Sequence, residues 1–90
     1  MSVAYYARRR LERRRDEALD ELEQARFRYG RAERAFSVAR EIARVSPSRR
    51  NRVLARAGAE LFDARSALWL AETRFIEART PFDAAAGGAA

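Results

Sequence analysis

Residues 18–39 read ALDELEQARFRYGRAERAFSVA, and residues 57–78 read AGAELFDARSALWLAETRFIEA. Both stretches carry alanine at every seventh position, and a large apolar residue stands between successive alanines. Apolar residues at alternating three- and four-residue spacing form one stripe along an α-helix, as they do in coiled coils. The two stretches therefore predict two helices that pack against each other. The alanines are Ala18, Ala25, Ala32, Ala39, Ala57, Ala64, Ala71 and Ala78, and the large residues between them are Leu22, Tyr29, Phe36, Leu61, Leu68 and Phe75.

A short turn is expected between the two helices. Ser46 is a favoured N-cap residue and Pro47 is tolerated at the first helical position, so a turn at 46–48 joins helix one, from about residue 2 to 45, to helix two. Helix two is expected to end near Thr80 because Pro81 stops it, and residues 81–90, rich in alanine and glycine, are predicted to form a flexible tail. The predicted fold class is all-α, a two-helix antiparallel coiled-coil hairpin with an alanine-rich seam.

Folding the chain back at this turn places small residues opposite large ones. Tyr29 then faces Ala64, and Phe36 faces Ala57. Such layers let two helices approach closely at normal packing density, whereas a shifted register would stack alanine on alanine and is less favourable. The layering is similar to that of the ROP-type helical hairpins, which dimerise into four-helix bundles. This resemblance, limited to the seam, implies assembly into a larger helical bundle.

The N-terminal part of helix one is expected to project from the hairpin. When the seam is extended backward, Arg15 and Arg8 fall at its large-residue positions, at the level where helix two is expected to end. We therefore predict an arginine-rich helical arm at 1–14 and a hairpin at 15–80.

Composition excludes several kinds of chemistry. The chain of 90 residues has no cysteine and no histidine, so it forms no disulfide, no zinc site with sulfur or nitrogen ligands, and no histidine acid–base pair. It carries no phosphate-binding glycine motif and no recognisable nucleophile with its base, and its carboxylates have the spacing of solvated acids. We predict a protein that is not an enzyme, with no cofactor, no metal site and no small-molecule substrate.

No apolar run approaches the roughly 20 residues that cross a bilayer, so no membrane contact is expected and a cytoplasmic location, or one within a phage particle, is predicted. All 19 basic residues are arginine, a bias typical of a GC-rich genome such as that of a bacterium or its phage.

The net charge of +6 is concentrated in two segments. Residues 1–15 hold six arginines and one glutamate, residues 42–59 hold five arginines and no acid, and the remainder is net negative. Three interpretations stay open: a solvated surface with ordinary pairs such as Arg8 with Glu12, a nucleic-acid contact, and a contact with an acidic protein. The candidate polyanion-binding residues are Arg8, Arg9, Arg10, Arg13, Arg14, Arg15, Arg49, Arg50, Arg52 and Arg56.

A second apolar stripe lies off the seam. Helix two carries Phe62, Trp69 and Ile76 at seven-residue spacing, and helix one carries Val38 and Ile42. Aromatic residues are favoured anchors at interfaces, so we predict that these residues contact another copy or another helical protein. The alternative is that a bent hairpin or its own tail covers them.

Two helices that share one seam bury little apolar area, so self-association or a partner is the expected remedy. We predict a non-enzymatic assembly or adaptor protein that self-associates or docks on a partner, engages polyanionic surfaces with its basic ends, and belongs to a phage or bacterial complex. The alternative is a nucleic-acid-binding protein of low sequence specificity, acting on DNA or RNA through the arm.

Overall fold

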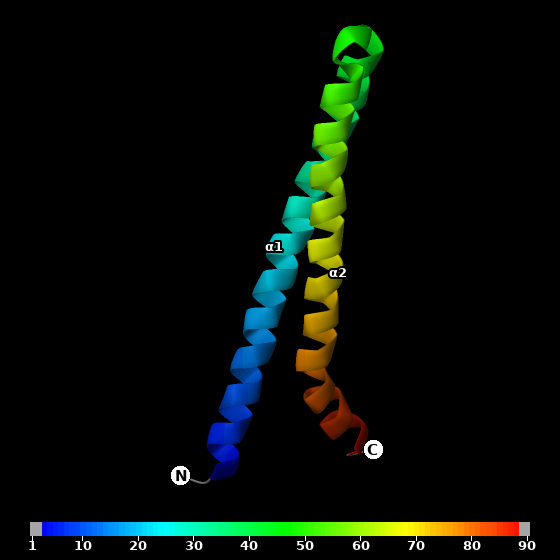
Figure 1. Ribbon diagram of the computed structural model, residues 1–90. Helices are drawn as coiled ribbons and strands as arrows, with labels where there is room; N and C mark the ends of the chain where they lie inside the picture. Colours follow the sequence, from blue (N-terminus) through cyan, green and yellow to red (C-terminus); the bar gives the residue numbers. More distant parts are fainter. Residues whose placement is uncertain (1–2, 89–90) are drawn as a thin grey trace.

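The computed structural model describes residues 3–88, with side chains described for residues 3–83. The chain forms a helix α1 at Val3–Val45, a short 3₁₀ helix η1 at Pro47–Arg49, and a helix α2 at Arg50–Gly88. The two long helices run antiparallel and make an elongated rod of 67 × 26 × 13 Å (Figure 1). The prediction of an all-α, two-helix antiparallel hairpin is therefore confirmed.

The core between the two helices consists almost entirely of alanine. Of the eight residues that are buried in the part of the chain with described side chains, seven are alanines, and Ala64 of α2 has no exposed surface. The large residues of the seam are half-buried at its sides, apart from Leu22, which is fully enclosed. Small side chains at the centre let the helix backbones approach closely while the larger ones pack around them. The buried residues are Ala18, Leu22, Ala32, Ala39, Ala43, Ala64, Ala71 and Ala78.

The surroundings of Gly58 show which residues of the two helices lie opposite each other. A Cβ atom added at Gly58 would lie 3.8 Å from Cε2 of Phe36. Position 58 therefore packs against Phe36, one residue from the predicted partner Ala57. A large residue of α1 thus lies opposite small residues of α2, as the seam pattern predicts.

The turn is tighter than expected. Between residues 45 and 50 only Ser46 lies outside a helix, because η1 follows it directly. The prediction that the Ser46 side chain caps helix two is wrong, since that side chain makes no capping hydrogen bond. The backbone replaces it: the Ser46 N–H donates to the Ile42 carbonyl at 2.7 Å, and the Arg49 N–H donates to the Ser46 carbonyl at 3.0 Å.

The prediction that helix two ends near Thr80 is also wrong, because α2 continues through Pro81 to Gly88. Proline removes one helical hydrogen bond and its ring crowds the carbonyl of residue 77, which can kink a helix without ending it, and an ion pair between Arg79 and Asp83 at 3.1 Å spans the position. Three alanines, the strongest helix formers, follow Asp83. The predicted tail is therefore helical at 81–88, and residues 89 and 90 lie outside the described residues. The ribbon changes direction in this last part of α2 (Figure 1).

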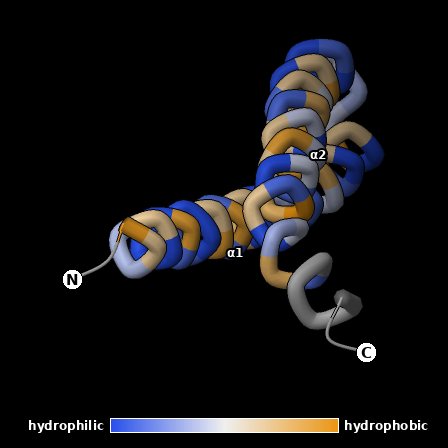
Figure 2. Tube along the Cα trace, turned by 90° about the horizontal axis from the view of Figure 1, so that it is seen from below, coloured by the Kyte–Doolittle hydropathy of each residue, from blue (hydrophilic) through white to orange (hydrophobic). Residues whose placement is uncertain are grey.

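The two helices diverge toward the chain termini (Figures 1 and 2). Near this end of the hairpin Arg15 of α1 contacts Phe82 of α2, with the guanidinium carbon 4.4 Å from the ring centre. Residues 3–10 of the predicted arm are all exposed, and its first two residues lie outside the described part of the chain.

Candidate interaction surfaces

The outer stripe of α2 is exposed as predicted from its spacing. Phe62, Trp69 and Ile76 have 70%, 64% and 54% of their surface accessible, and we call these three residues the α2 stripe. Phe62, Trp69 and the neighbouring Leu70 border a shallow hollow of about 500 Å³. Neither the other helix nor the described part of the C-terminal segment covers the α2 stripe.

Val38 and Ile42 do not join this surface. Ile42 follows Arg28 by fourteen residues, about four turns, so it lies on the face of α1 from which Arg28 reaches Glu60 of α2. Phe62 follows Glu60 by two residues, about 200° around the helix, and so points to the other side of the hairpin. The predicted interface residues therefore form two separate apolar surfaces on opposite faces.

The arginines of the arm are only partly paired with acids. Glu12 binds Arg8 at 3.4 Å and Arg9 at 3.7 Å, and Arg15 lies 3.5 Å from Asp16. The Arg8–Glu12 pair expected from the sequence is present. No carboxylate among the described residues pairs with the remaining arm arginines, which are Arg10, Arg13 and Arg14.

The arginines at the turn carry more free charge. Within the described chain, no ion pair involves the four predicted residues Arg49, Arg50, Arg52 and Arg56. Arg50 also borders a hollow of about 300 Å³. The other residues that line this hollow are Arg40, Ala43, Arg44 and Leu54. Arg44 is paired with Glu41, so the turn end is basic without being wholly unpaired.

The charges are distributed differently along the folded hairpin than the net charges of the sequence segments suggested. Residues 16–23 contain five acids and no arginine, whereas residues 26–65 contain eleven arginines and four acids. The hairpin folds residues 26–65 back on themselves at the turn, so that the two ends of this segment lie side by side. We call residues 26–65 the turn half. The basic region therefore extends from the turn along α1 as far as Arg26, and the acidic segment of α1 is confined to residues 16–23, next to the arm.

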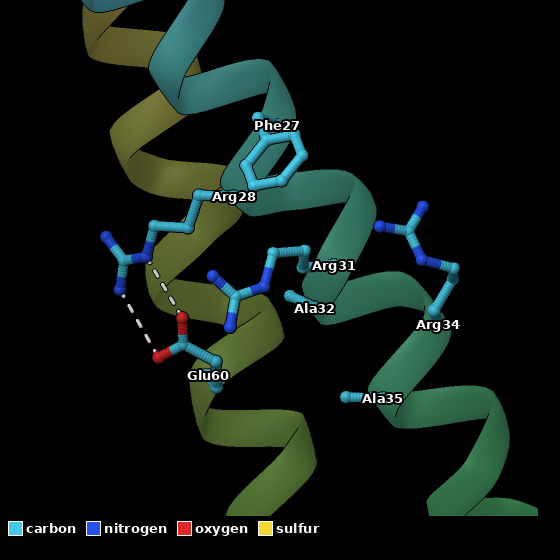
Figure 3. Close-up of a pocket in the computed structure, with 7 residues that line it drawn as sticks. All are labelled: Phe27, Arg28, Arg31, Ala32, Arg34, Ala35 and Glu60. Atoms are coloured by element: carbon cyan, nitrogen blue, oxygen red, sulfur yellow. Dashed lines mark hydrogen bonds and ion pairs between the residues drawn. The ribbon is translucent and has the colours of Figure 1, made fainter.

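A further hollow, which the sequence did not predict, lies within the turn half. It has a volume of about 690 Å³, and we call it the Phe27 hollow. Phe27, Arg31 and Arg34 stand on successive turns of α1, and Arg28 reaches across to Glu60 of α2 (Figure 3). Its floor is made by Ala32 and Ala35. The sequence signal for this site was an aromatic residue beside three arginines at helical spacing.

Electrostatic interactions at this hollow leave two of its arginines without a carboxylate partner. Arg28 donates two hydrogen bonds to Glu60, at 3.0 and 3.3 Å. These bonds lower the pKa of the Glu60 carboxyl below its ordinary value and raise the pKa of Arg28. Among the described residues, no ion pair involves Arg31 or Arg34. The Arg31 guanidinium instead lies 5.9 Å from the centre of the Phe27 ring.

In the described part of the chain, no three acidic side chains gather closely enough to hold a metal ion. No described helix has an apolar stretch of the length and hydropathy needed to span a membrane. The chain matches no protein-family model, and comparisons with curated proteins and with solved structures returned no match.

Proposed function

We propose that this protein is a non-enzymatic assembly protein that associates with further copies of itself through the α2 stripe. The observation that carries the proposal is the exposure of Phe62, Trp69 and Ile76 along one edge of an otherwise regular helix. Several exposed large apolar side chains on one face of a helix favour a protein–protein contact.

The composition of the core supports the same proposal. The buried residues of the hairpin are seven alanines and one leucine, so the interior removes few large side chains from water. Burying a large apolar side chain such as Phe62, Trp69 or Ile76 stabilises by about 1.5–3 kcal/mol. Packing against a second hairpin would therefore add the burial of these three large side chains to an interior in which Leu22 is buried and the other large seam residues are only half-buried.

The arginine-rich surfaces indicate which chemical groups a partner of the assembly would carry. Arg10, Arg13 and Arg14 in the arm and the four arginines at the turn have no carboxylate partner among the described residues. Guanidinium groups bind phosphate and carboxylate oxygens through paired hydrogen bonds. We propose that these two ends engage polyanionic surfaces while the α2 stripe holds the copies together.

Light scattering coupled to gel filtration tests the self-association. We expect the wild type to elute with the mass of an oligomer and Trp69→Ala to shift toward the monomer, because the substitution removes the largest anchor of the stripe. The matched control is Phe27→Ala, which removes an equally exposed aromatic ring from the other side of the hairpin. A monomeric wild type, or a mass that falls equally in both variants, would refute association through the α2 stripe.

A further inference from the structure

The Phe27 hollow combines an exposed ring with unpaired positive charge. The Phe27 side chain has 65% of its surface accessible although it is bordered by three arginines. Proteins that bind single-stranded nucleic acids place aromatic rings, on which bases stack, beside cationic groups that hold the phosphates. Neither the predicted interface residues nor the predicted polyanion-binding residues include this site.

The arginines of the hollow have different roles. Arg28 is neutralised by its two hydrogen bonds to Glu60, which leaves it little capacity to bind a phosphate. Arg31 and Arg34 form no ion pair among the described residues, although Arg31 also lies in the field of Glu60, and the Arg31 guanidinium carbon lies 5.9 Å from the centre of the Phe27 ring. This cation–π contact restrains the ring while much of it stays accessible.

Two alanines line the hollow together with its aromatic and charged residues. Its floor is formed by Ala32 and Ala35, whose methyl side chains leave the surface of α1 low beside the ring. Arg34 folds back along the helix, with Nη1 3.6 Å from the position that a Cβ on Gly30 would take. The volume of about 690 Å³ falls within the range of roughly 300–1,000 Å³ for small-ligand sites.

We propose that the Phe27 hollow binds one nucleotide of a single-stranded nucleic acid, with the base stacked on Phe27 and the phosphates held by Arg31 and Arg34. A single strand is required because the bases of a duplex are stacked on one another and cannot reach the ring. The rest of the strand has further cationic contacts available, since the turn half carries eleven arginines against four acids. The proposal rests on the polyanion binding of the proposed function and assigns it a defined site in the middle of α1.

Fluorescence anisotropy with three labelled probes tests this site: an oligouridine, the matching oligodeoxyuridine, and a duplex of the same length. Loss of base stacking weakens binding by about 5- to 150-fold, so we expect Phe27→Ala to lose affinity for a single strand by that factor and to bind the duplex as the wild type does. Phe27→Trp is expected to retain the single-strand affinity. The two uridine probes differ in the 2′-hydroxyl and show whether the strand is RNA or DNA.

The matched control is Val45→Ala, which truncates a similarly exposed apolar side chain of α1 outside both the Phe27 hollow and the α2 stripe and is expected to leave single-strand binding unchanged. The double variant Arg31→Gln/Arg34→Gln should reduce the slope of log affinity against log salt by about 1.4 for single strands. Circular dichroism verifies that each variant stays helical.

Each outcome separates the two proposals. Single-strand binding that is equally strong in Phe27→Ala and the wild type would overturn the nucleotide site and leave polyanion binding intact. Absence of binding to all three probes would overturn both the nucleotide site and nucleic acid as the polyanion. The mass measurements on Trp69→Ala decide self-association independently of either result.

Discussion

Gly58→Ala is expected to stabilise the hairpin, and by more than the same change at Gly30. Glycine in a helix interior is less favourable than alanine by about 0.5–1 kcal/mol because the unfolded chain has more freedom to lose. Neither glycine has a positive φ, so alanine fits both backbones. At Gly58 the added methyl would also meet Phe36 at 3.8 Å, an ordinary contact in the half-buried seam, and burying a methyl contributes up to about 0.8 kcal/mol.

The expected gain is therefore about 1–2 kcal/mol for Gly58→Ala. For Gly30→Ala it is about 0.5–1 kcal/mol, because the new methyl meets only the flexible end of Arg34 at 3.6 Å. In a chain of this size each kcal/mol raises Tm by about 4–8 °C. The difference between the two variants isolates the packing contribution of Phe36.

Thermal and urea unfolding, followed by circular dichroism at 222 nm, measure both variants. Protein concentration is held constant, since association would itself raise the apparent stability. If Gly58→Ala gains no more than Gly30→Ala, Phe36 does not pack against position 58, and the register of the hairpin is wrong. A lowered Tm for Gly58→Ala would have the same meaning, because the methyl would then be meeting something closer than Phe36.

Two further predictions concern the seam and the ion pair between the helices. Ala64→Leu should lower the free energy of unfolding in urea by about 1–3 kcal/mol, because Ala64 is buried and has no space for a larger side chain. The control Ala7→Leu, in the exposed arm, should leave the stability unchanged. Equal effects of the two substitutions would contradict a close-packed alanine core. The hydrogen bonds from Arg28 lower the pKa of the Glu60 carboxyl in the folded state. The ion pair therefore contributes its full stabilisation above the pKa of glutamate in the unfolded chain, about 4.3, and loses it as the pH falls through the lower pKa of the folded state. Glu60→Gln should therefore be less stable than the wild type at neutral pH and equal to it in strong acid, and a difference that persists in acid would assign the effect to packing.

The sequence was sufficient for the fold because one pattern governed it. Alanine at every seventh position, with larger residues between, repeats in both halves of the chain and is separated by a single serine–proline turn. The pattern requires two helices and places small residues against large ones, and the contact of Phe36 with position 58 agrees with it.

The ends of the helices were harder to predict because several weak effects compete there. Pro81 was expected to end helix two, yet the helix continues to Gly88 with a change of direction (Figure 1), and the Arg79–Asp83 pair and the alanines that follow favour its continuation. The Ser46 cap failed for a related reason, since the 3₁₀ turn at Pro47 satisfied the backbone groups without a side chain.

The surfaces were predicted only in part, because residue spacing fixes the face of one helix but does not relate it to the other. Spacing alone identified Phe62, Trp69 and Ile76 as one stripe, but it grouped them with Val38 and Ile42, which the fold places on the opposite side. The Phe27 hollow was missed because its residues come from both helices: Glu60 neutralises Arg28 only once the hairpin has closed.

The separation of the two faces has a consequence for the proposed activities. An interface built on Phe62, Trp69 and Ile76 leaves the Phe27 hollow open, because Phe62 points to the side of α2 opposite Glu60. Association through the α2 stripe would then bring two or more copies of the hollow onto one particle. A strand that occupies one hollow reaches the next at a high effective concentration, so sites of modest individual affinity act together. Under the two proposals, assembly therefore strengthens the binding of a single strand, because several hollows contact it at once. Trp69→Ala should weaken the binding of long single strands. It should leave unchanged the binding of a strand that is too short to reach a second hollow.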